Sequence, residues 1–169
     1  MERKELIETI KKGCAAGLVP TPWGSPARFL NRRMLSRPPL LEVVVPELKL
    51  LLPKNCDYLI GIGNGGTEIT RELARQTGNR SAILRKDREK HLVPPANCNR
   101  LTERQICLVD DSICGGNKIR EALSLLAPFG LTITGILCVV LWDKSHQDFN
   151  GIKIQSLVTG NDLVSRPKK

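Results

Sequence analysis

The stretch "ICLVDDSICGGNKIREAL", residues 106–123, decides the fold class, because strand, turn and helix patterns follow one another within it. An apolar run predicts a buried strand that ends in two adjacent acids, Asp110 and Asp111. A glycine pair at 115–116 follows, and helical spacing begins directly after it. Carboxylates repel phosphate, whereas a glycine turn that opens a helix binds it. The stretch therefore predicts a ligand that carries both hydroxyl groups and a phosphate.

The alternation of strands and helices continues on both sides of this stretch. Apolar runs predict strands over 57–62, 81–84, 105–110, 132–141 and 152–158. Amphipathic spacing predicts helices over 67–78 and 117–130. This order predicts an α/β fold with a mostly parallel central sheet flanked by helices, in which ligands bind at the carboxyl ends of the strands.

The N-terminal part is less regular. Residues 3–13 predict a short amphipathic helix, and the segment 19–39, rich in proline and glycine, predicts an irregular hood. Residues 40–52 remain open between helix and strand, because their leucines have helical spacing but include three consecutive valines and Pro46. We expect a helix and hood over 1–40 and an α/β core over 41–169, together one compact domain.

Composition limits the class of protein. The chain has 169 residues, 41% of them hydrophobic, which suits one soluble domain with its own core. Its longest apolar stretch, 131–142, is too short to span a bilayer, and the charged first residues do not form a secretory signal, so we expect a cytoplasmic protein without a membrane partner. The six cysteines form no CxxC pair, which argues against zinc or a disulfide framework. A net charge of +9 favours a polyanionic partner, either nucleic acid or a phosphorylated small molecule.

Three segments at predicted strand ends carry candidate site residues. "GIGNGGTE", 61–68, opens a helix with glycines whose amides can face an anion. The acid pair can accept hydrogen bonds from hydroxyl groups or hold a metal, and the turn that follows suits one phosphate. "RKDREKH", 85–91, has the composition of an ordinary solvated charge run, but its position after a predicted strand also suits a mobile lid that brings cations to a phosphate leaving group.

"CLVDDSICGGNKIREAL" resembles the phosphoribosyl diphosphate (PRPP) motif of the type I phosphoribosyltransferases, and its spacing most resembles the orotate branch. The resemblance implies that Asp110 and Asp111 hold the ribose hydroxyls and, weakly and mostly through PRPP, Mg²⁺. It implies that the 5-phosphate lies against Ser112, Ile113, Cys114, Gly115, Gly116, Asn117 and Lys118. "IGIGNGG" is similar to the pyrophosphate loop of the family, which implies PRPP contacts at Gly63, Asn64, Gly65 and Gly66.

Further segments extend the resemblance over most of residues 5–165. "LRKDREKH" is similar to the lid of the orotate enzymes, which implies catalytic roles for Arg85, Lys86, Lys90 and His91. "WGSPARFLN" resembles the hood segment of the family, with Phe29 toward the base.

Several positions depart from the family pattern. Glu89 occupies a lid lysine position, and Cys114 and Asn117 replace threonines. The arginine expected to contact orotate is missing from 143–147, which leaves Arg28 or Lys144 as candidates to replace it.

The resemblance implies a PRPP-dependent pentosyltransferase, with orotate and PRPP giving orotidine 5′-phosphate and pyrophosphate in the presence of Mg²⁺. It also implies a homodimer in which the lid of one subunit reaches the active site of the other. Two alternatives stay open. One is a phosphoribosyltransferase that acts on another base, and the other is a non-catalytic regulator of the same fold that binds a nucleotide or RNA.

Overall fold

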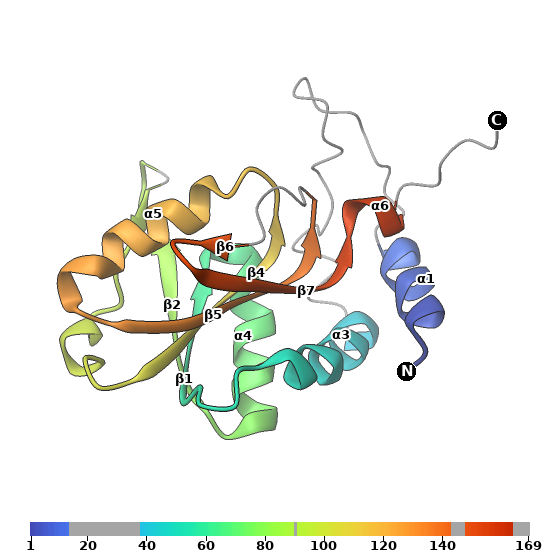
Figure 1. The fold of residues 1–169 in the computed structure, drawn as a ribbon, viewed down its shortest axis with the longest axis horizontal. Coiled ribbons are helices and arrows are strands. Elements are labelled where there is room, and N and C mark those ends of the chain that lie inside the picture. The colour runs from blue at the N-terminus through green and yellow to red at the C-terminus, as the bar shows by residue number, and fades with distance from the viewer. Residues whose placement is uncertain (14–37, 90, 143–147, 164–169) are drawn as a thin grey trace.

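The chain forms one seven-stranded sheet with helices on both faces (Figure 1). The computed structural model describes residues 1–13, 38–89, 91–142 and 148–163. The strand order is β3-β2-β1-β4-β5-β7-β6. The five inner strands are parallel, and the two short edge strands β3 and β6 are antiparallel to their neighbours. The strands are β1 Tyr58–Ile62, β2 Arg80–Lys86, β3 Leu92–Val93, β4 Gln105–Ile113, β5 Thr132–Leu141, β6 Asp148–Phe149 and β7 Ile152–Thr159.

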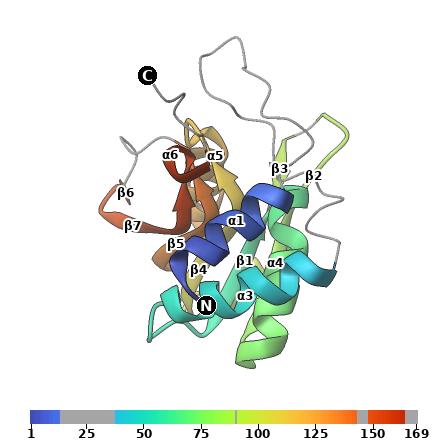
Figure 2. The ribbon, with the colours of Figure 1, turned by 90° about the vertical axis from the view of Figure 1, so that its right-hand side faces the viewer.

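The helices form two layers around this sheet, so the predicted α/β class is confirmed. α5 covers one face, and α1, α3 and α4 cover the other (Figures 1 and 2). None of the helices within the described ranges is long and apolar enough to cross a membrane. The helices are α1 Arg3–Gly13, α3 Pro38–Leu51, α4 Gly63–Thr77, α5 Asn117–Leu126 and α6 Gly160–Leu163, with 3₁₀ turns η1 Cys98–Arg100 and η2 Ala127–Phe129.

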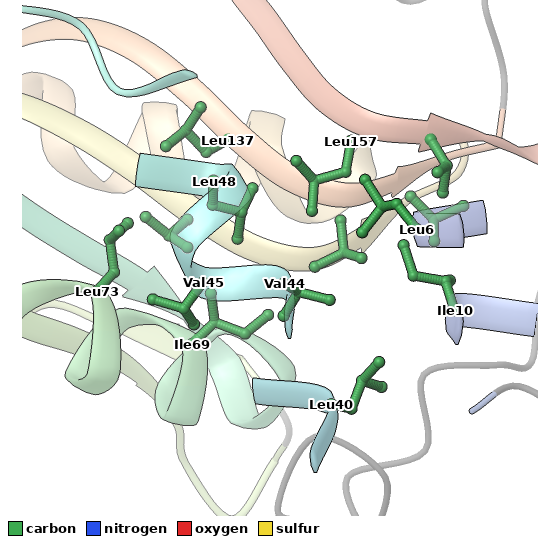
Figure 3. Close-up of a cluster of buried hydrophobic side chains, with 14 of the residues drawn as sticks. Leu6, Ile10, Leu40, Val44, Val45, Leu48, Ile69, Leu73, Leu137 and Leu157 are labelled. Atoms are coloured by element: carbon green, nitrogen blue, oxygen red, sulfur yellow. The ribbon is translucent and has the colours of Figure 1, made fainter. Parts of the chain in front are cut away.

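Side-chain alternation along the central strand separates two hydrophobic cores. In β4, Ile106 and Leu108 pack in the core under α5, whereas Cys107 and Val109 pack in the core under α3 and α4. Figure 3 shows the second core, where three helices meet the sheet through Leu6, Ile10, Val44, Val45, Leu48, Ile69, Leu73, Leu137 and Leu157. Because both faces are covered, the strands are apolar along most of their length.

The segment 40–52, left open from the sequence, is helical. α3 buries Val44, Val45 and Leu48 completely, and these positions lie on one helical face. Pro46 lies inside the helix on its exposed side, so the carbonyl that loses a backbone donor there can be hydrated. Packing of one apolar face therefore outweighs the cost of the proline.

Several predicted boundaries were wrong, in most cases because elements extend further than their local patterns, although α5 ends at Leu126 and is followed by the 3₁₀ turn η2. β4 continues past the acid pair to Ile113, because its last residues pair with β5 at Val140 and Leu141. β2 continues to Lys86, where it pairs with the unpredicted edge strand β3. α4 begins at Gly63, so most of the predicted glycine loop is the first helical turn.

Candidate active site

The acid pair lies near the carboxyl end of β4, in the middle of the sheet. Asp110 and Asp111 are 1% and 7% exposed, which is rare for carboxylates and expensive without partners. Adjacent strand residues face opposite sides of a sheet. Asp110 accordingly faces the side of α5, and Asp111 faces the side of α4. Each carboxylate therefore lies beside the first turn of a different helix.

Asp110 has a partner for each carboxylate oxygen. Its Oδ1 accepts a hydrogen bond from the backbone N–H of Asp111 at 2.9 Å, and its Oδ2 lies 3.5 Å from Nζ of Lys118. Burial raises the pKa of Asp110 well above its usual range, and the charge of Asp111 raises it further, while Lys118 acts in the opposite direction. Burial would lower the pKa of Lys118, but Asp110 and Asp111 outweigh it and raise that pKa.

A cavity of about 240 Å³ opens beside Asp110, and it is lined by that residue together with residues 112–119. The strand passes into α5 through Gly116, whose φ of +71° is readily adopted only by glycine. The first backbone N–H groups of α5 have no helical partner, and the helix dipole favours an anion near them. The structure therefore brings together Asp110 and the predicted phosphate-binding residues Ser112 to Lys118. Ser112 and Ile113 belong to β4 rather than to the predicted turn.

Two residues that the sequence analysis missed brace this turn. Arg120 donates hydrogen bonds to the Gly115 carbonyl at 2.8 Å and to Oδ1 of Asn117 at 2.9 Å. Its guanidinium lies 5.2 Å from the ring centroid of Phe149, which packs so closely on Gly116 that a Cβ there would lie 2.1 Å from Cζ of the ring. The spacing from Asn117 to Arg120 could have suggested a helical pair. Nothing local places Phe149 there.

Asp111 meets the first turn of α4. A Cβ built on Gly65 would lie 2.3 Å from Cγ of Asp111, and one built on Gly66 would lie 2.4 Å from the carbonyl oxygen of Val109. The two glycines therefore allow α4 to begin directly against the acid pair. Gly63 has a φ of +60°, which favours glycine at the start of this turn. Of the predicted pyrophosphate-binding residues, Gly65 is thus brought against Asp111, within a helix rather than a loop.

The lid residues that the structure describes lie at the edge of the sheet. Arg85 and Lys86 end β2, and β3 pairs with them after a turn in which Asp87 Oδ1 accepts the backbone N–H groups of Glu89 and His91, each at 2.9 Å. The base of this hairpin is anchored to α5, because Leu92 N–H donates to Glu121 Oε1 at 2.7 Å. The cavity beside Asp110 is not lined by Arg85, Lys86 or His91. Arg85 instead lines a second cavity, of about 460 Å³, together with Arg71 of α4.

Four predicted site residues lie outside the described residues. They are the lid residue Lys90 and the candidate base contacts Arg28, Phe29 and Lys144. The acid pair, the phosphate turn, residues 63–66 and the other three predicted lid residues lie within the described part of the chain.

The acid pair was also predicted to hold Mg²⁺. Within the described ranges, no three His, Cys, Asp or Glu side chains gather in a way that could hold a metal ion. Mg²⁺ is commonly bound through one or two carboxylates, with phosphate oxygens of the substrate and water supplying the other ligands. Asp110, which lines the cavity beside the phosphate turn, fits as one carboxylate of such a site, whereas Asp111 faces the opposite side of the sheet, so the pair does not form a metal site by itself.

The chain is similar in sequence to a curated protein, although it matches no family model. An orotate phosphoribosyltransferase from Nocardioides sp. is 28% identical over 132 residues, which cover 75% of this chain and 73% of the relative.

Solved structures share the fold. UMP synthase of Leishmania donovani gives a TM-score of 0.77 at 19% identity, and the match covers 96% of this chain but only 37% of that longer one. Orotate phosphoribosyltransferase of Mycobacterium tuberculosis, in complex with PRPP, gives 0.73 at 16% identity and covers 95% of this chain and 98% of that one. Adenine phosphoribosyltransferase of Thermoanaerobacter pseudethanolicus gives 0.71 at 17% identity, with 90% and 99% covered. These structures share the fold of this chain, and the names of the last two refer to different bases, orotate and adenine.

Proposed function

We propose that this chain is a type I phosphoribosyltransferase, and that it transfers the phosphoribosyl group of PRPP to orotate, giving orotidine 5′-phosphate and pyrophosphate. The observation that carries this proposal is the shared cavity of Asp110 and the phosphate turn. A buried carboxylate beside a glycine turn at a helix start matches a ligand with hydroxyl groups and a phosphate ester. The curated orotate relative favours orotate as the acceptor.

The reaction breaks the bond between the anomeric carbon and pyrophosphate through an oxocarbenium-like transition state. Positive charge then develops on the ribose and negative charge on the departing pyrophosphate. Asp110 and Asp111 orient the ribose through its hydroxyl groups and lie near the developing positive charge. Gly63, Asn64, Gly65 and Gly66 present the first turn of α4 to the pyrophosphate, where each well-placed donor contributes about 3 kcal/mol.

Lid cations and a metal complete the charge balance of the leaving group. Arg85, Lys86, Lys90 and His91 would bring positive charge to the pyrophosphate and keep water from the reactive carbon. Because Arg85 lines a cavity other than that of Asp110, we propose that these cations act in the active site of a partner subunit in a homodimer. Mg²⁺, bound by Asp110 and Asp111 mostly through PRPP, would supply further charge to the departing oxygens.

A cytoplasmic location suits this activity. Within the described residues, Cys56, Cys98, Cys107 and Cys138 form no disulfide, which is compatible with a reducing compartment.

The direct test is pyrophosphate release from PRPP and Mg²⁺ with a panel of bases. We expect release with orotate and none without a base. Release only with another base would keep the reaction class and replace the acceptor, which the adenine-specific structural relative makes the main competing outcome. No release with any base, together with RNA binding that weakens steeply with salt, would favour the regulator instead.

A further inference from the structure

Lys118 and Asp110 form an ion pair inside the cavity proposed to bind PRPP. Lys118 is the second residue of α5, and its side chain is 46% exposed, whereas that of Asp110 is 2% exposed. Among the described residues that line this cavity, Lys118 is the only cation. The same ammonium group is therefore needed by a buried carboxylate before the ligand binds and by a phosphate afterwards.

We propose that the 5-phosphate of the ligand draws Lys118 away from Asp110, so that the lysine changes partner when the site fills. In the ligand-free protein Lys118 neutralises Asp110. In the complex its ammonium moves to the phosphate, and the released Oδ2 of Asp110 accepts a ribose hydroxyl. This inference rests on the proposed function, because it assumes a phosphorylated sugar in this cavity.

The composition of the turn makes such an exchange useful. At positions where the family usually has threonine, Cys114 has only a weak S–H donor and Asn117 has an amide, so the turn lacks the two hydroxyl donors of the family pattern. A lysine supplies three donors and a full charge on a flexible four-carbon stem, which allows the ammonium to move within the cavity. Oδ1 of Asp110 stays on the Asp111 N–H, so the carboxylate keeps its orientation when Lys118 leaves.

The exchange would make the site selective for a ligand that carries both groups. Phosphate alone would draw Lys118 away and leave a buried carboxylate without its cation, which is unfavourable. A sugar without phosphate would have to compete with Lys118 for Asp110. Only a phosphorylated sugar replaces both halves of the ion pair at once.

Inorganic phosphate tests the exchange, because it lacks the hydroxyl groups. Its affinity is measured by calorimetry for the wild type, Asp110→Asn, Lys118→Met and the double variant, at one pH and one salt concentration. We expect Asp110→Asn to bind phosphate about tenfold more tightly, because Lys118 is then free, and Lys118→Met to bind it about tenfold more weakly. In the Lys118→Met background, the gain from Asp110→Asn should fall below about twofold.

Equal gains from Asp110→Asn in both backgrounds would overturn the exchange, because removal of a negative charge would then explain the effect without Lys118. Failure of phosphate to bind any of the four proteins would overturn it too. Lys118→Gln repeats the cycle if Lys118→Met does not fold.

Ribose 5-phosphate separates this inference from the proposed function. We expect both Asp110→Asn and Lys118→Met to weaken its binding by tenfold or more. If the wild type binds neither ribose 5-phosphate nor PRPP, the proposed function fails. If the wild type binds both and Lys118→Met binds them equally well, only the exchange fails.

Discussion

Among single residues of this site, we expect the buried carboxylate of Asp110 to have the largest effect on stability and on ligand choice. Asp110 is almost fully buried, and it pairs with a half-exposed lysine, Lys118, at 3.5 Å. Leaving a carboxylate in such surroundings costs folding free energy, which a purely structural residue would not need to spend. The proposed ligand, whose hydroxyl groups would donate hydrogen bonds to Asp110, would account for the charge at this position.

This cost predicts that Asp110→Asn stabilises the ligand-free protein. Because the folded pKa of Asp110 is raised, its contribution to stability is complete below the usual aspartate range and is lost as the pH rises through the raised pKa. Asparagine does not ionise, so the variant does not lose this stability as the pH rises. We expect the variant to gain at least about 1 kcal/mol at pH 8, or about 2–4 °C in Tm, and to gain less at pH 4. Thermal unfolding across this pH range checks the prediction, which a variant less stable than the wild type at pH 8 would contradict.

For single residues, the sequence predicts which side chains form the site better than it predicts where each of them lies. The acid pair and the residues after it could be assigned from the local pattern, and the structure places Asp110 and residues 112–118 around one cavity. The opposite orientation of Asp110 and Asp111 follows from strand alternation, once β4 is known to extend beyond them. The contact of Arg120 with Phe149 could not be predicted, because Phe149 belongs to β6. The pairing of β6 with β7 in the sheet decides where this strand lies.

At the scale of elements, two helix starts converge on the end of one strand. α5 begins beside Asp110, and α4 begins against Asp111. The main strands and helices could be predicted from periodicity, because their buried faces dominate the local pattern. Their ends could not, since strand pairing and the approach of α4 to β4 decide them.

The close approach of α4 predicts that Gly65→Ala is costly. The added methyl group would overlap the Asp111 carboxylate, and we expect a loss of about 1–3 kcal/mol in stability together with weaker PRPP binding. Gly115→Ala is the matched control for stability, because nothing lies within 4 Å of the added Cβ. Thermal unfolding of both variants checks this, and an equal effect on Tm would show that the contact at Gly65 is not tight.

At the scale of the whole molecule, the described lid cations lie away from the cavity that holds Asp110. Leu92 and Glu121 anchor the base of the lid hairpin to α5, at the edge of the sheet. An active site completed by a second subunit would bring lid cations and acid pair together. The fold alone does not specify this assembly.

A shared active site predicts complementation between two inactive variants. Asp110→Asn with Asp111→Asn removes the acids, and Arg85→Ala with Lys86→Ala removes lid cations. Random mixing of the two proteins makes half of the dimers mixed, each with one intact site, so we expect about a quarter of the wild-type rate of pyrophosphate release. No recovery after unfolding and refolding them together would show that each subunit uses its own lid.

The proposal that the acid pair binds PRPP is tested most directly by calorimetric titration of PRPP with Mg²⁺ into the wild type and the Asp110→Asn, Asp111→Asn double variant. Glu103→Gln, which changes an exposed acid before β4, is the control. We predict saturable binding to the wild type and the control, and at least a hundredfold weaker binding to a double variant that still unfolds cooperatively. Equal affinity in all three proteins would contradict the assignment of this site.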